Sequence, residues 1–259
     1  QVRKDMTSFL DELEPLLESV ERVYWAGGEP LITKEHYNIL DKWIDMGKND
    51  VKMDYTTNFT QMYYKRKTAF EYWNKFEHVR VAGSLDANHM RGEYLRKNMD
   101  WTQVVQNRRT MLEQCPHVYF EITPTVSVYN VLNLPDFHKE WIEDGLLEPG
   151  NIRINILLDP TYMRLSILPE NIKEKVKIRY QKHLNYLGQF DPKNAKSYVD
   201  ITTLDEHQEE IFREYYRCEL NNNDALVMLD LHKKLLNQQI LSESYIQQEF
   251  NWLRSFLTK

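Results

Sequence analysis

The chain has 259 residues, of which 42% are hydrophobic and 28% are charged, and its formal net charge at pH 7 is −6. This size fits one α/β barrel, or one domain with a helical extension. The acidic balance argues against a nucleic-acid-binding surface, and no apolar run approaches the roughly eighteen residues of a membrane helix, so we expect neither nucleic acid nor a membrane as partner. The two cysteines, Cys115 and Cys218, form no CxxC pair, which favours a cytoplasmic protein without a disulfide framework.

The N-terminal third predicts one helix followed by a strand–turn–helix unit. Apolar residues recur at three- and four-residue steps over residues 6–20, as in an amphipathic helix. Residues 21–25 then alternate between polar and apolar and run into Gly27-Gly28, after which Thr33 is placed to cap a second helix.

The strand–helix pattern then repeats along the chain. We predict strands over residues 51–57, 79–85, 118–126 and 152–158, and helices through Phe70 and Trp73 and over residues 101–114, 135–143 and 169–187. Asp100 and Gln103 resemble a capping pair for the helix that begins at 101. Strands that alternate with helices require crossover connections, so the sheet is predicted to be parallel. Periodicity alone leaves open whether that sheet is open or curled into a barrel.

A change of pattern near residue 188 divides the chain into two predicted parts. Residues 1–188 carry the strand–helix units, and residues 189–203 are polar and resemble a linker. The remainder predicts two or three helices, so residues 189–259 are expected to form a linker and a helical C-terminal extension.

Polar residues follow every predicted strand, at the end where parallel α/β folds bind their ligands. They are Gly27-Gly28-Glu29-Pro30, Thr56-Thr57-Asn58, Ser84-Leu85-Asp86, Thr123-Pro124-Thr125 with Ser127, and Asn155 with Asp159. Two consecutive glycines let backbone groups approach a ligand closely, and Glu29 adds a carboxylate suited to an ammonium group. Pro30 stiffens the exit from the turn. The first of these segments therefore predicts a ligand-binding turn.

From Met6 to about Leu187 the chain resembles the radical S-adenosylmethionine (radical SAM) family, in which a Gly-Gly-Glu-Pro motif ends the second barrel strand and holds the amino group of the cofactor. The resemblance implies a partial TIM-like (β/α)6 barrel lacking its first strand. It also implies that Gly27, Gly28, Glu29 and Pro30 bind S-adenosylmethionine.

Further cofactor contacts are implied by the same resemblance. Ser84 and Asp86 match the family's Ser-x-Asp-Gly pattern except that Ala87 replaces the glycine. Asn58 is placed like the asparagine after the third strand, and Arg91 or Arg96 like the residue that meets the cofactor carboxylate. Thr125 and Asn155 are placed like contacts to the ribose and adenine.

The implied activity is reductive cleavage of S-adenosylmethionine at a [4Fe–4S] cluster, which yields a 5′-deoxyadenosyl radical that abstracts hydrogen from a substrate. An electron donor is then required. The segments 91–94, 107–109 and 134–138 resemble the twitch-domain subgroup, which implies a peptide or protein substrate. The family's CxxxCxxC cluster loop is absent from this sequence, and we expect its cysteines upstream of Gln1. The chain alone is therefore expected to be inactive.

Two other functional classes remain open. The chain could be a non-catalytic binding or scaffold protein with a degenerate barrel, or a barrel enzyme that uses acid–base chemistry through Glu29, Asp86 and Glu121. The sequence contains no Walker loop, GxGxxG or Ser–His–Asp order. The eight histidines show no HxxxH or HxH pairing, so no zinc site is predicted.

Overall fold

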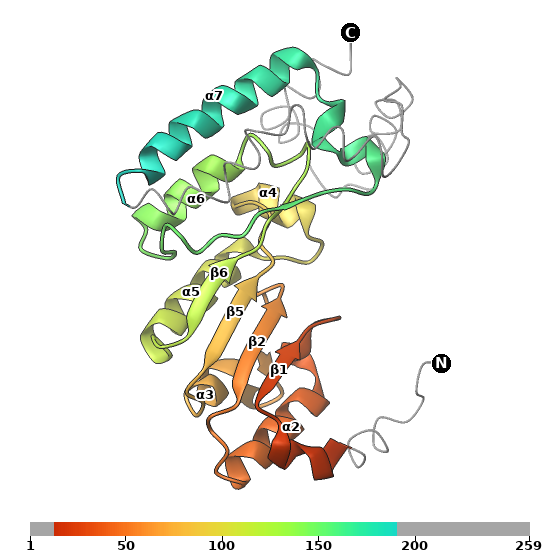
Figure 1. The fold of residues 1–259 in the computed structure, drawn as a ribbon, viewed down its shortest axis with the longest axis vertical. Coiled ribbons are helices and arrows are strands. Elements are labelled where there is room, and N and C mark those ends of the chain that lie inside the picture. The colour runs from red at the N-terminus through yellow and green to blue at the C-terminus, as the bar shows by residue number, and fades with distance from the viewer. Residues whose placement is uncertain (1–12, 191–259) are drawn as a thin grey trace. The chain divides into compact units, whose positions relative to one another are not determined.

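The structure is a computed structural model that describes residues 13–190 of the chain (Figure 1). These residues form an α/β fold with a parallel sheet. Its helices are α2 (Lys34–Asp45), α3 (Ala69–Trp73), α4 (His89–Leu95), α5 (Trp101–Gln114), α6 (Leu134–Glu143) and α7 (Glu170–Leu187). Short 3-10 turns are η1 (Glu14–Ser19), η2 (Pro30–Ile32), η3 (Thr161–Met163) and η4 (Leu165–Ile167).

The main sheet has four parallel strands in the order β1-β2-β5-β6. Their bounds are β1 (Arg22–Trp25), β2 (Lys52–Thr57), β5 (Val79–Gly83) and β6 (Tyr119–Ile122). Each strand pairs with the next one in the main sheet, so the order never reverses. Right-handed crossovers without a reversal put the connecting helices on one face, as in the wall of a barrel and unlike a doubly wound sheet. An isolated parallel bridge between Ile122 and Ile152 extends the parallel pairing beyond β6.

Large aromatic side chains fill the space between this sheet and its helices. The Tyr55 ring of β2 lies 5.4 Å from Trp73 of α3, and Trp25 of β1 lies 6.4 Å from Trp43 of α2. Tyr55, Trp73 and Trp43 are fully buried. Successive side chains of β2 point to opposite faces of the sheet. Met53, Tyr55 and Thr57 therefore share one face and are buried, whereas the residues between them are not.

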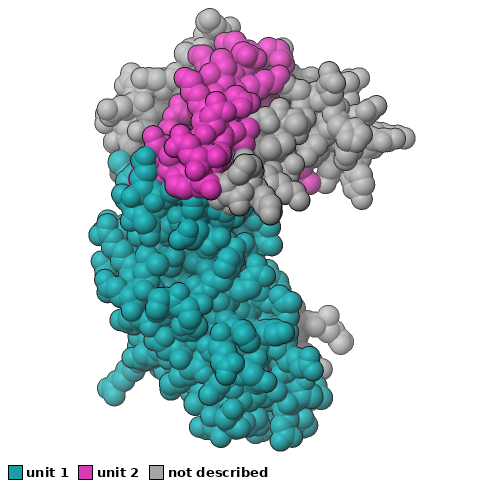
Figure 2. Space-filling model, turned by 60° about the vertical axis from the view of Figure 1, so that its left-hand side comes forward, with its two compact units in different colours: residues 1–93, 98–124, 141–153 teal, residues 94–97, 125–140, 154–259 magenta. Residues whose placement is uncertain are grey.

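The chain divides into two compact units, coloured in Figure 2. Unit 1 consists of residues 1–93, 98–124 and 141–153 and contains the main sheet. Unit 2 consists of residues 94–97, 125–140 and 154–259. In unit 2, β7 (Thr125–Val126) pairs in parallel with β8 (Asn155–Ile156).

Several predicted elements differ from the structure. Within the predicted helix over 6–20, the residues Glu14–Ser19 form a 3-10 helix, because Pro15 supplies no N–H to an α-helical bond. The predicted strand 118–126 is divided into β6 and β7 at Thr123-Pro124, since proline cannot donate to the ladder. The predicted strand 152–158 reduces to β8 with the bridge at Ile152.

Other predictions agree with the structure or lie beyond it. Helix α5 has the predicted bounds, and the Asp100 side chain accepts from the Gln103 N–H at 3.2 Å. A hairpin of β3 (Tyr63–Tyr64) and β4 (Lys67–Thr68) was not predicted. The linker and helices expected over 191–259 lie outside the described residues. No helix within residues 13–190 is long and apolar enough to span a membrane.

Candidate functional site

The Gly27-Gly28 turn leaves the carboxyl end of β1 in a left-handed conformation. The φ angles are 81° at Gly27 and 50° at Gly28, a region that side chains with a Cβ rarely adopt. A Cβ built on either glycine would meet no atom within 4 Å, so the space beside the turn is open. Neither glycine carbonyl accepts a hydrogen bond from the residues that the structure describes. Both carbonyls are therefore available to a donor such as an ammonium group.

The Glu29 carboxylate ties this turn to the end of the neighbouring strand. Its Oε1 atom accepts from the Thr57 hydroxyl at 2.8 Å, and its Oε2 atom accepts from the Asn58 N–H at 2.8 Å. A weaker bond from the Leu31 N–H, at 3.4 Å, caps η2. Each carboxylate oxygen has two lone pairs, so Oε2 keeps one for a further donor.

Two opposing influences act on the Glu29 carboxyl. Burial is the larger influence and raises the pKa of Glu29 above its usual value, because the charged form loses hydration. The bonds from Asn58, Thr57 and Leu31 oppose that rise. The carboxylate is thus a partly desolvated charge held by neutral donors, a setting in which a cation would be a favourable partner.

Asn58 and Ser84 lie at the same edge of the sheet as Glu29. The Ser84 N–H donates to the Thr57 carbonyl at 2.8 Å, which continues the strand pairing one residue beyond β5. Asn58 Oδ1 accepts from the Thr60 N–H at 3.0 Å, so its Nδ2 is directed elsewhere. Neither Asn58 Nδ2 nor the Ser84 hydroxyl has a partner within residues 13–190. This edge therefore offers one amide donor and one hydroxyl beside the turn.

Sequence reasoning placed Thr57 at a strand end but recognised neither Thr57 nor Asn107 as a support of this edge. Thr57 donates to Glu29 and accepts from the Phe59 N–H at 3.0 Å, which links the turn to the loop after β2. Asn107, buried in α5, donates from Nδ2 to the carbonyls of Phe59 and Thr60, both at 3.0 Å. Phe59 has φ 58°, and its ring is fully buried. In the sequence, Asn107 stood out only as part of the segment 107–109 that resembles the twitch-domain subgroup. Its hydrogen-bond partners lie about fifty residues away in the sequence, so no local pattern indicated its role.

Asp86 and Arg91 flank the start of α4, also in unit 1. Arg91 is buried, and Asp86 is half-buried one residue after the buried Leu85. Ala87 is not among the residues with positive φ, so the turn does not need the glycine that the family pattern has there. A glycine is needed instead at Gly92, because a Cβ there would lie 2.5 Å from the Ala87 carbonyl oxygen.

The remaining predicted site residues, Arg96, Thr125 and Asn155, belong to unit 2. Thr125 and Asn155 are direct partners in the β7–β8 pairing, so the structure brings these two together. Asn155 is exposed, and Arg96 is half-buried. Their participation in one site with the Gly27–Pro30 turn stays a prediction.

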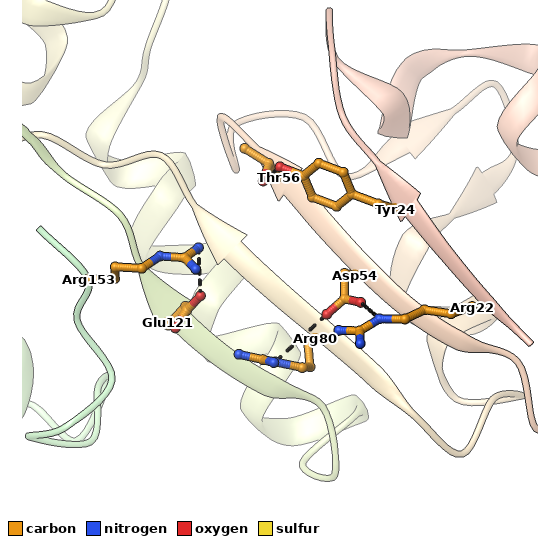
Figure 3. A network of polar contacts seen from close by, with 7 residues as sticks. All are labelled: Arg22, Tyr24, Asp54, Thr56, Arg80, Glu121 and Arg153. Carbon is orange, nitrogen blue, oxygen red and sulfur yellow. Dashed lines mark hydrogen bonds and ion pairs between the residues drawn. The ribbon is translucent and has the colours of Figure 1, made fainter. Parts of the chain in front are cut away.

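The face of the main sheet opposite its helices carries a row of polar side chains. Figure 3 shows them on β1, β2, β5, β6 and the segment beyond: Arg22, Tyr24, Asp54, Thr56, Arg80, Glu121 and Arg153. Arg22 Nε lies 2.6 Å from Asp54, and Arg153 pairs with Glu121 at 3.1 Å. Together with Tyr55 and Ala82 these residues line a hollow of about 370 Å³. Parallel sheets are usually covered by apolar contacts on both faces, so a polar, open face is unusual for a sheet of this type.

The Glu121–Arg153 ion pair also bears on the acid–base alternative. Glu121 is only 13% exposed and faces the polar hollow, whereas Glu29 is bound at the strand ends by three donors. Both carboxylates are already engaged by partners within the protein. Their geometry therefore gives no support to an enzyme that uses them as general acid and base.

Cluster-binding thiolates are missing from the described part of the chain. Residues 13–190 contain no group of three His, Cys, Asp or Glu side chains that could hold a metal ion. Cys115 is buried, and burial raises the pKa of its thiol to about 11, which disfavours the thiolate that binds iron. Cys218 lies outside the described residues.

Comparisons with known proteins gave matches only among solved structures. No family profile and no curated protein matches the chain. The structure "Native anSMEcpe with bound AdoMet" is similar, with a TM-score of 0.46 and 18% identity over 72% of this chain and 50% of that one. The structure "Native anSMEcpe with bound AdoMet and Cp18Cys peptide" gives a TM-score of 0.41 and 18% identity over 68% of this chain and 51% of that one.

The chain thus spans about half the length of the structures that it matches.

Proposed function

We propose that this chain is the S-adenosylmethionine-binding part of a radical SAM enzyme. The observation that carries the proposal is the Gly27-Gly28 turn, whose two open carbonyls are held at the strand edge by the Glu29 carboxylate. Three acceptors on consecutive residues of this turn, two carbonyls and one carboxylate oxygen, match in number the three N–H donors of an aminoacyl ammonium group.

The neighbouring residues supply complementary groups for the rest of that ligand. Asn58 Nδ2 and the Ser84 hydroxyl are polar groups at the same edge that have no partners within residues 13–190. We assign the carboxylate contact to Arg91 or Arg96, and the nucleoside contacts to Ser84, Thr125 and Asn155. Asp86 and Pro30 shape the turns that present these groups.

The described residues do not fit a [4Fe–4S] cluster, because their single cysteine, Cys115, is buried with a raised thiol pKa. The proposal for this chain is therefore limited to holding S-adenosylmethionine. The cofactor supplies radical chemistry in this family, and cluster thiolates would have to come from other residues. A peptide or protein substrate, an electron donor and a cytoplasmic location complete the proposal by family resemblance.

The test uses the complete native protein, reconstituted anaerobically with iron and sulfide. Titration calorimetry with S-adenosylmethionine should give binding that Glu29→Ala weakens by about tenfold or more, the loss expected when a charge-assisted hydrogen bond is removed. The matched control is Asp45→Ala, which removes an exposed carboxylate from α2 in the same unit. Equal affinity in Glu29→Ala and the native protein would reject the role assigned to Glu29.

The non-catalytic alternative is separated by the coding sequence. A strand followed by CxxxCxxC upstream of Gln1 supports the enzyme, whereas a start codon close to Gln1 supports a scaffold protein with a degenerate barrel. An anaerobic absorption spectrum without a visible iron–sulfur band after reconstitution would favour the same alternative.

A further inference from the structure

A groove between α6 and α7 lies within unit 2. Its volume is about 510 Å³. The α7 side of the groove presents Lys175, Arg179 and Lys182, which follow one another at i, i+4 and i+7 and so share one helix face. The α6 side adds Lys139.

The charge of this groove is strongly unbalanced. Asp136 is the single acidic residue of its lining and is paired with Arg179. Lys175 and Lys182 make no ion pair with any residue from 13 to 190. Four cationic side chains thus face one carboxylate, an arrangement that attracts an anionic partner.

Apolar side chains line the groove between these charges. Ile178 is 50% exposed, and Leu132, Pro135 and Tyr186 extend the apolar surface. The Lys139 ammonium lies 5.4 Å from the centre of the Tyr186 ring, in cation–π geometry. A phosphate ion would use only the cations, whereas an amphipathic acidic peptide would use both kinds of surface.

The sequence beyond α7 contains a peptide of this chemistry. Residues 204–215 carry five carboxylates, Asp205, Glu206, Glu209, Glu210 and Glu214, against one arginine, Arg213. Leu204, Ile211, Phe212 and Tyr215 interrupt the charges with apolar groups. No stretch of equal length in residues 191–259 has more carboxylates.

The chain is long enough for this peptide to reach the groove. The stretch from Lys175 to Tyr186 spans about 17 Å along α7 at roughly 1.5 Å per residue. The fourteen residues between Phe190 and Asp205 can extend over about 45 Å. A tethered peptide within such reach has an effective concentration on the order of millimolar, so a modest intrinsic affinity suffices.

We infer that residues 204–215 of this chain bind in the α6–α7 groove, with their carboxylates on Lys175 and Lys182 and their apolar groups against Ile178 and Tyr186. This contact covers a cationic, partly apolar surface of unit 2 with the chain's own C-terminal part. It is independent of the proposed function, because it involves neither the cofactor nor the strand edge.

The test is zero-length carbodiimide cross-linking of the full chain, followed by peptide mass spectrometry. Amide bonds from Lys175 and Lys182 to carboxylates within 204–215 are expected. They should be lost in 1 M salt, where the screening length is about 3 Å. An equal mixture of ¹⁴N- and ¹⁵N-labelled chains should show that the two linked peptides carry the same label.

Charge reversal provides the matched variants. Lys175→Glu/Lys182→Glu should lose contact with 204–215, whereas Lys177→Glu, on α7 outside the groove, should leave the Lys175 and Lys182 cross-links in place. A fourfold variant adds Glu209→Lys and Glu210→Lys to the first pair. Its carboxylates then lie on α7 and its amines in the peptide, so cross-links between positions 175 or 182 and positions 209 or 210 should return. Circular dichroism verifies that each variant is folded.

Three outcomes would overturn the inference. They are native cross-links from the groove to other segments, cross-links that join differently labelled chains, and the absence of groove cross-links at low salt. Mixed labels would instead identify a second copy of the chain as the occupant. The cross-links of the native chain alone distinguish these outcomes, even if a charge-reversed variant fails to fold.

Discussion

Gly92 occupies a point in unit 1 where two backbone segments approach closely. A Cβ on this residue would lie 2.5 Å from the Ala87 carbonyl oxygen and 3.4 Å from the Met99 sulfur. A carbonyl of the backbone cannot rotate away as a side chain can, so α4 would have to move relative to the segment that carries Asp86 and Ala87.

We expect Gly92→Ala to lower the free energy of unfolding by about 1–3 kcal/mol, the usual cost of overpacking. Gly188→Ala is the matched control, because Gly188 ends α7 with φ −60° and its Cβ would lie 3.4 Å from the nearest atom. Urea denaturation measures both. A loss no larger in Gly92→Ala than in Gly188→Ala would contradict the tight approach.

Helices α6 and α7 are joined by a buried pair of imidazoles. His138 Nδ1 lies 3.0 Å from His183 Nε2, so one neutral ring donates this hydrogen bond and the other accepts it. Burial lowers the pKa of His138 to about 3 and that of His183 to about 4. In unit 1, burial likewise lowers the pKa of His36 to about 3.

These depressed values predict an acid-sensitive fold. The unfolded chain, with histidine pKa values near 6.5, binds protons that the folded chain does not bind. Stability is therefore fully present above about pH 6.5 and falls as the pH drops toward 4. Each such histidine contributes a slope of up to roughly 1.4 kcal/mol per pH unit.

Urea denaturation between pH 7 and pH 5 measures this slope. His183→Gln should make it shallower, because one of the protons taken up on unfolding is removed. His78→Gln, which changes an exposed residue, should leave the slope as in the native chain. An identical slope in all three proteins would contradict the account of the buried pair.

Helix α5 holds the loop after β2 through one side chain. We expect Asn107→Leu to lower the free energy of unfolding by about 2–3 kcal/mol, because the carbonyls of Phe59 and Thr60 would lose their donor. Gln106→Leu, on the exposed side of the same helix, should change it by less than about 0.5 kcal/mol. Thermal or urea unfolding compares the two, and similar effects would argue against a specific clamp.

Unit 1 is assembled from three separate stretches of sequence. Its last stretch, residues 141–153, includes Trp141, which is fully buried with its ring 5.5 Å from Trp101 and 6.3 Å from Phe120. The same stretch supplies the Leu146 carbonyl, which accepts from Arg108 Nε at 2.7 Å. A chain that ends before this stretch leaves an apolar surface and a buried guanidinium without their partners.

We therefore expect a chain of residues 1–124 to be loosely packed, with strong binding of the dye ANS and weak near-ultraviolet circular dichroism. A chain of residues 1–153 keeps every stretch of unit 1 and is the control, expected to show native-like near-ultraviolet signals. Equal dye binding by the two chains would contradict the interleaved unit.

The sequence predicted those features that depend on neighbouring residues. Periodicity and Asp100 located α5, and the two glycines followed by Glu29 located the turn after β1. The division at Pro124 was missed because the alternation of apolar and other residues continues across it, from Ile122 to Val126. Thr57 and Asn107 were missed as supporting residues since their partners are distant in sequence, and no local pattern marks such contacts.

The attachment of Glu29 to Thr57 and Asn58 has a consequence for the kinetics of recognition. These bonds lie within the protein, so the turn is ordered by its own contacts. A ligand that binds there loses its own freedom of motion but does not have to order the loop. Association at a preorganised site of this kind needs no slow loop rearrangement, and differences in affinity among related ligands should appear mainly in their dissociation rates.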